Sequence, residues 1–214
     1  MNAACFKISI KDKLGLLFLS TASSCPALAY HPMGGETPTT LWQGLLSGLA
    51  HPVIELDHLL LLIGIATATA IARIAPKQAM TYLLALVAAG VVGTSMRVAS
   101  LTIPFAEAAA AISLLLVGLW LWITKLSGFA AVGLWVVGGF FHGFAYGGAI
   151  IGSEATPLVA YLWGLPLIQA LLMIGTYLIV RNYGMVTEKN LTSVARATSS
   201  VISSIALRML WTAI

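Results

Sequence analysis

Long apolar runs, separated by short breaks rich in proline and polar residues, organise this chain. Each later run has the roughly 20 apolar residues that a helix needs to cross a bilayer. The first run is short and is interrupted at His51-Pro52, and proline is best tolerated in the first turn of a helix. We therefore expect a half-helix or re-entrant piece ending near Ala50 and a spanning helix starting at Pro52. The further spans are predicted at 77–94, 104–124, 129–151, 157–180 and 193–214.

Composition places the chain among integral membrane proteins. It has 214 residues, of which 59% are hydrophobic and 8% charged, whereas soluble domains carry about 25% charged residues. We therefore predict an all-α, polytopic bundle of about six transmembrane helices, forming a single domain over residues 30–214. The tryptophans Trp120 and Trp122 are expected to anchor the end of their helix at the membrane–water interface.

The N-terminus has the pattern of a cleavable signal peptide. Three lysines precede a short apolar core at residues 14–19, and Ala27-Leu28-Ala29 fits a cleavage site. We predict a signal peptide over residues 1–29; an uncleaved first helix is the alternative. Basic residues then gather in alternate loops, with only Arg97 on the other side. This bias predicts a multi-pass protein of the bacterial inner membrane with a periplasmic mature N-terminus.

Four ionisable residues lie close together inside the first apolar region: His51, Glu55, Asp57 and His58. Each costs roughly 3 kcal/mol at membrane depth unless it is paired or wetted. Spacings of 4 and 3 put His51, Glu55 and His58 on one helical face. Asp57 points away from that face, where it is placed to orient a neighbouring histidine. The cluster therefore predicts a functional site.

His142 lies in a glycine-rich stretch of a later span and is predicted at the same depth, with Glu154 just beyond that span. Imidazole and carboxylate without thiolate suit nickel, cobalt, zinc or copper(II) rather than copper(I). The predicted metal ligands are His51, Glu55, Asp57, His58, His142 and Glu154. The structural alternative is that His51 caps a helix end and His58 is a hydrogen-bonded core residue.

Four further residues are accessory candidates. His31 would be the second residue of the mature chain, where it either receives a metal or belongs to a disordered end. Glu107 lies one turn after Pro104 at the outer end of its helix. Gln169 lies midway along its span and either lines a pathway or bonds a neighbouring helix, and Tyr146 follows His142 by one turn.

The chain resembles the HupE/UreJ family of small bacterial membrane proteins. The resemblance rests on His51-Pro52-x-x-x-x-Asp57-His58-Leu59-Leu60 and on Phe141-His142-Gly143-x-Ala145-x-Gly147. It implies a helical bundle with a cleavable signal and a nickel, sometimes cobalt, permease that supplies hydrogenase or urease.

The chain also departs from the family's pattern. Glu55 stands where the family usually has glycine, and Phe144 and Tyr146 stand where many members have histidines. Glu154 is reached only through an insertion, residues 148–153. One more carboxylate and fewer imidazoles leave the identity of the metal open.

We therefore predict a permease that imports a divalent transition-metal ion from the periplasm, nickel first and cobalt next, for metalloenzyme maturation. No nucleotide-binding motif G-x-x-x-x-G-K-[ST] occurs in the sequence, so the membrane potential or another energised component would drive transport. The expected partners are the bilayer and the metal ion, with a second copy or an accessory component as further candidates; no prosthetic group or nucleic acid is expected. The alternatives are a non-transport metal-binding or assembly factor and a membrane metalloenzyme.

Overall fold

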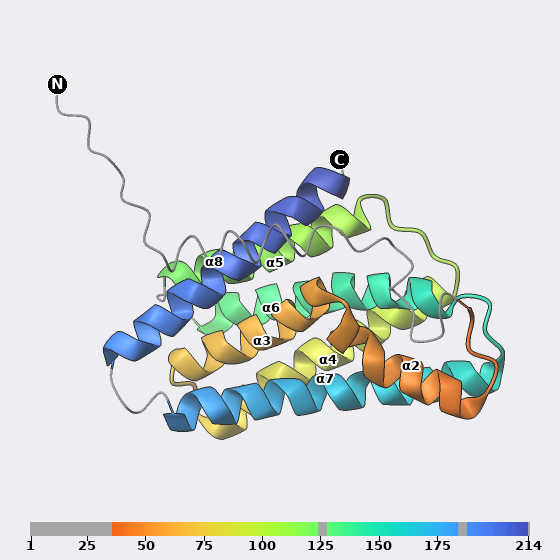
Figure 1. Cartoon of the computed structure of the whole chain (residues 1–214), viewed down its shortest axis with the longest axis horizontal. Coiled ribbons are helices and arrows are strands. Elements are labelled where there is room, and N and C mark those ends of the chain that lie inside the picture. Colours follow the sequence, from red (N-terminus) through yellow and green to blue (C-terminus); the bar gives the residue numbers. More distant parts are fainter. Residues whose placement is uncertain (1–35, 124–127, 184–187, 214) are drawn as a thin grey trace.

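The computed structural model of the protein describes residues 36–123, 128–183 and 188–213, and all regular structure within them is helical. Figure 1 shows the helices gathered into one elongated bundle. In chain order they are α2 (Leu41–Ile54), α3 (Leu56–Ile71), α4 (Pro76–Val98), α5 (Ala106–Ile123), α6 (Gly128–Gly147), the short 3-10 helix η3 (Gly148–Ile150), α7 (Ala155–Tyr183) and α8 (Glu188–Ala213). The predicted all-α class is confirmed. The predicted signal peptide, residues 1–29, and His31 lie outside the described residues.

Three helices of the described ranges are long and apolar enough to cross a membrane: α4, α5 and residues Ala155–Asn182 of α7. The pair α2 and α3 qualifies together as a fourth span, bent by 72° at a short break. Large apolar side chains such as Trp163 (73% exposed) and Trp211 (86% exposed) cover the outside of the bundle, as a lipid environment favours. The structure thus supports three or four spans, and the count of six stays a prediction.

The break in the first span lies at Glu55, so its predicted position at His51-Pro52 is wrong. Helix α2 continues through Pro52 to Ile54, and Glu55 then has an extended backbone, with φ −84° and ψ 111°. A capping box of Thr40 and Gln43 fixes the start of α2. The missing N–H of Pro52 weakens the last turn, and the helix ends within three residues.

Glycines allow α2 to pack closely against α7. A Cβ at Gly44 would lie 2.2 Å from the carbonyl oxygen of Pro157, and one at Gly48 would lie 2.5 Å from that of Tyr161. The backbones of α2 and α7 therefore pack in direct contact, as small residues allow between membrane helices. Figure 1 shows α2 lying along one end of α7. This packing holds His51 against α7.

A second glycine contact joins α4 to α6. A Cβ at Gly143 would lie 2.1 Å from the carbonyl oxygen of Gly90, and one at Gly93 would lie 2.1 Å from that of Phe140. The hydroxyl of Thr94 also donates to the Gly143 carbonyl at 2.8 Å. These contacts fix the height and rotation of α6, and with them the position of His142.

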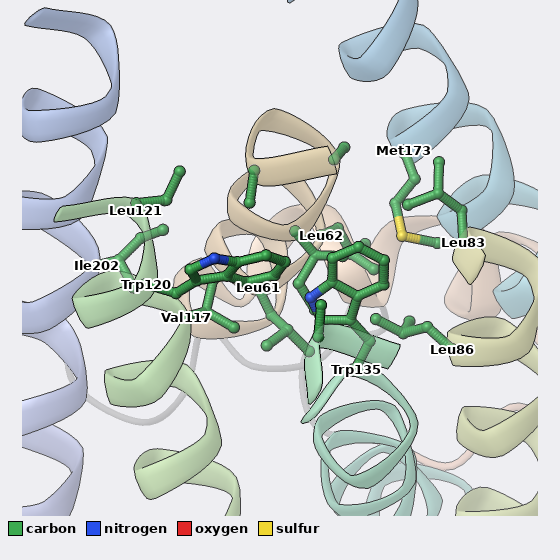
Figure 2. Packing of buried hydrophobic residues seen from close by; sticks show 14 of the residues in the cluster. Leu61, Leu62, Leu83, Leu86, Val117, Trp120, Leu121, Trp135, Met173 and Ile202 are labelled. Atoms are coloured by element: carbon green, nitrogen blue, oxygen red, sulfur yellow. The ribbon is translucent and has the colours of Figure 1, made fainter. Parts of the chain in front are cut away.

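The main hydrophobic core is formed by residues of α3 to α8 and does not include the histidines. Figure 2 shows Trp120 of α5 and Trp135 of α6 in this core near Leu61 and Leu62. The two indole rings have centroids 5.2 Å apart. Trp120 is only 4% exposed, so its predicted role as an interface anchor is wrong: it faces α6, whereas Trp122, two residues further on, points outward and is 57% exposed.

Candidate metal centre

Four helical segments converge on one buried group of histidines. His51 lies in the last turn of α2, His58 in the first turn of α3, and His142 near the end of α6, against α5. Their side chains are 3%, 2% and 1% exposed, respectively. The structure therefore brings together the histidines that lie far apart in the sequence.

Glu55 lies between the first two histidines. One carboxylate oxygen, Oε1, is 3.1 Å from Nε2 of His51, and the other, Oε2, is 2.7 Å from Nε2 of His58. The three residues meet although they do not share one continuous helix, because the 72° bend at Glu55 folds the ends of α2 and α3 around its side chain. The residue at the break is thus the residue that links the two imidazoles.

His58 and His142 meet through their other nitrogens. Nδ1 of His58 lies 2.9 Å from Nδ1 of His142, and Nε2 of His142 lies 3.1 Å from the carbonyl oxygen of Ala110 in α5. Oδ2 of Asp57 is 3.8 Å from Nδ1 of His58. Asp57 therefore belongs to the side of the His58 ring that faces His142.

The contact between the two Nδ1 atoms is one that a cation could replace. A neutral imidazole has one N–H and one nitrogen lone pair, so the contact needs a hydrogen on one of the two nitrogens. A cation bound between the two lone pairs can take the place of that hydrogen.

Two tyrosines complete the surroundings of the cluster. The hydroxyl of Tyr161 in α7 lies 3.1 Å from Nδ1 of His51 and donates to the Tyr146 carbonyl at 3.1 Å. The ring of Tyr146 is 4.0 Å from the ring of His58 and 5.0 Å from that of His51, measured between centroids. Tyr161 is absent from the sequence-based candidates, although a tyrosine inside an apolar span is a signal that could have identified it.

The ligand atoms form two groups that each could hold one metal ion. The first group is His51, Glu55 and His58; the second group is Asp57, His58 and His142. Within each group, one ligand atom per residue lies within 4.8 Å of the others. Each offers two imidazole nitrogens and one carboxylate oxygen, which suits borderline divalent ions such as nickel and cobalt.

The remaining candidates lie apart from both groups or beside them. Glu154 is exposed just before α7. Glu107 is exposed in the first turn of α5, where it lines a surface cavity of about 380 Å³ together with Arg97. Gln169 is buried in α7 next to Tyr146, and its Oε1 has no hydrogen-bond partner among the described residues.

The fold and the site together define a helical membrane protein with a buried histidine–carboxylate cluster. Residues 17–209 match the family described as HupE / UreJ protein. The chain therefore belongs to the HupE/UreJ family, whose members have a membrane metal transport or accessory role. A search of curated proteins and a search of solved structures gave no significant match.

Proposed function

We propose that this protein is a permease that imports a divalent transition-metal ion, nickel first and cobalt second, from the periplasm into the cytoplasm. The observation that carries the proposal is the buried cluster centred on His58, which gathers three imidazoles and two carboxylates within apolar helices. Ionisable groups in such surroundings are expensive and mark ion pathways. Membership of a metal transport or accessory family supports the same conclusion.

The donor set supports the choice of ion. Imidazole nitrogen favours the later first-row ions, whereas magnesium and calcium prefer sites made only of oxygen. Nickel and cobalt accept mixed nitrogen and oxygen ligands such as those of the two groups. The inside-negative potential would draw the ion inward with about 2.3 kcal/mol per charge per 100 mV.

Metal accumulation in cells tests the proposal. Cells with and without the protein are scanned for nickel, cobalt, copper and zinc, and radiolabelled nickel uptake is then challenged with competing ions. We expect the protein to raise nickel content most and cobalt next, and cobalt but not magnesium to compete. Strong inhibition by magnesium would indicate an oxygen-only site. Nickel binding by the purified protein without accumulation in cells would favour the accessory role instead.

A further inference from the structure

We propose that the two ligand groups are separate subsites that share His58, and that the ion passes from one ring nitrogen of this imidazole, Nε2, to the other, Nδ1. The proposal rests on the proposed function, since it specifies how the permease handles its ion. His58 belongs to both groups, and no other residue of the described chain does. The question is therefore whether the cluster forms one site or two.

The two nitrogens of His58 face different ligands. Nε2 is directed at Glu55, with 2.7 Å to Oε2, and Glu55 in turn contacts Nε2 of His51 at 3.1 Å. Nδ1 is directed at His142, with 2.9 Å between the Nδ1 atoms, and at Asp57. The nitrogens of an imidazole ring diverge, so an ion on Nε2 is held by the first group and an ion on Nδ1 by the second.

Imidazole chemistry makes the two positions alternative. A neutral imidazole has one N–H and one nitrogen lone pair, so His58 binds an ion through one of its two nitrogens at a time. When the ion leaves the lone pair of Nε2 and binds that of Nδ1, Nδ1 loses a proton to water by way of Asp57, and Nε2 gains one from water by way of Glu55. Both carboxylates are partly exposed, and the ring stays neutral. His58 is then the ligand that both positions have in common.

The composition of the groups suits such a transfer. Each provides two imidazoles and one carboxylate, so the two positions should have similar affinities. Conduction requires sites that bind well enough to admit an ion and weakly enough to release it, which several similar sites in a row achieve. His51, His58 and His142 are buried, which limits the access of water to their nitrogens, whereas the carboxylates of Glu55 and Asp57 are partly exposed.

Nickel binding by the purified, full-length protein separates one site from two. Three double variants each remove one imidazole and one carboxylate. His51→Ala/Glu55→Gln spares the second group, Asp57→Asn/His142→Ala spares the first group, and His51→Ala/Asp57→Asn breaks both. The three proteins are therefore matched in the number and type of ligands lost, and they differ only in how these losses are distributed.

If the two subsites are alternatives, the nickel affinity should depend strongly on how the lost ligands are distributed between the two groups. Loss of one of two similar positions lowers the association constant by only about twofold by mass action. Both sparing variants should therefore bind one nickel ion within about tenfold of the wild-type affinity, whereas the variant that breaks both groups should lose about 100-fold or more. If the sparing variants lose as much as that variant, or if all three bind equally well, the two-subsite proposal is wrong.

A variant of a buried residue outside the cluster serves as the control for effects on folding. Ser199 of α8 donates to the Gly118 carbonyl of α5 at 2.6 Å, and Ser199→Ala should bind nickel like the wild type. Only variants with the wild-type elution profile and helix content enter the comparison. Each sparing variant provides the contrast independently, so the loss of one to misfolding leaves the other.

The same proteins in liposomes distinguish this proposal from the proposed function. Transfer needs both subsites, so the sparing variants should bind nickel and yet transport it at least about tenfold more slowly than the wild type. Sparing variants that transport at the wild-type rate would contradict the transfer step. A wild type that transports no metal would contradict the proposed function, and the binding pattern would still decide between one site and two.

Discussion

Nδ1 of His58 lies 2.9 Å from Nδ1 of His142, although 84 residues separate them in the chain. The two residues belong to different helices, α3 and α6, so their contact depends on how these helices pack. The contact depends on the bend at Glu55, which sets the start of α3, and on the glycine contact with α4, which sets the position of α6. The packing of small residues thus determines the geometry of the polar site.

That dependence predicts the effect of Gly143→Ala. The added methyl group would lie 2.1 Å from the carbonyl oxygen of Gly90, so α4 and α6 must move apart and shift His142. We expect a loss of about 1–3 kcal/mol in stability and reduced nickel uptake, measured by thermal unfolding in detergent and by an uptake assay.

Gly133→Ala is the matched control on the same helix, because a Cβ at Gly133 meets no atom within 4 Å. Its stability and uptake should equal those of the wild type. Equal behaviour of the two alanine variants would show that the glycine contact does not position the site.

The hydroxyl of Tyr161 is predicted to orient His51. Tyr161→Phe keeps the ring but removes the group 3.1 Å from Nδ1 of His51. Loss of a group that hydrogen-bonds a metal ligand typically lowers metal affinity or activity by about 10–100-fold. We therefore expect the rate of nickel uptake to fall about tenfold. Initial rates at equal amounts of protein in the membrane measure the effect.

Tyr177→Phe provides the comparison for Tyr161→Phe. Tyr177 also lies in α7, but its hydroxyl donates to the carbonyl of Ile74, at 2.9 Å, and it does not belong to either ligand group. This variant should leave the uptake rate per folded protein unchanged. A similar loss in both variants would mean that the hydroxyls stabilise the fold only.

Glu55→Gly introduces the glycine that the resemblance to the HupE/UreJ family leads us to expect at this position. It removes the carboxylate that contacts both His51 and His58, so we expect weaker apparent affinity for nickel in uptake with protein abundance little changed. The concentration dependence of uptake and an immunoblot measure the two quantities. Unaltered affinity would mean that Glu55 only occupies the helix break and takes no part in binding.

Topology predicts where reporters fused to the chain will be active. The distribution of basic residues predicts that Lys125 lies in the cytoplasm and Ser153 in the periplasm. An alkaline phosphatase fusion should therefore be active at Ser153 and inactive at Lys125. The reverse pattern would place the metal cluster near the inner membrane surface and rule out a periplasmic entry site.

The sequence predicts which residues belong to the cluster, but it predicts their arrangement in space less well. The spacing of His51, Glu55 and His58 identified three residues that do contact one another, since charged groups in an apolar run have few other uses. The predicted position of the helix break was wrong because Pro52 weakens α2 without ending it at once, and the helix continues to Ile54 before it breaks at Glu55. The local sequence also does not show the close packing of Gly44 and Gly48 against α7.

Other parts of the site could not be predicted because they depend on tertiary contacts. Tyr161 reaches His51 only because α2 and α7 pack backbone to backbone. Glu154 follows the span of His142 closely in the sequence, yet it is exposed and belongs to neither ligand group. Trp120 is buried since α5 turns this side chain toward Trp135.

Nickel uptake into proteoliposomes under an inside-negative potential tests the central claim most directly. The comparison is between the wild type and His58→Ala, because His58 contributes to both ligand groups. We predict that the wild type accumulates nickel well above protein-free liposomes and that cobalt competes with it, whereas His58→Ala, folded and reconstituted in equal amount, remains at the protein-free level. Equal uptake by the two proteins, or no uptake by the wild type, would contradict a permease that works through this cluster.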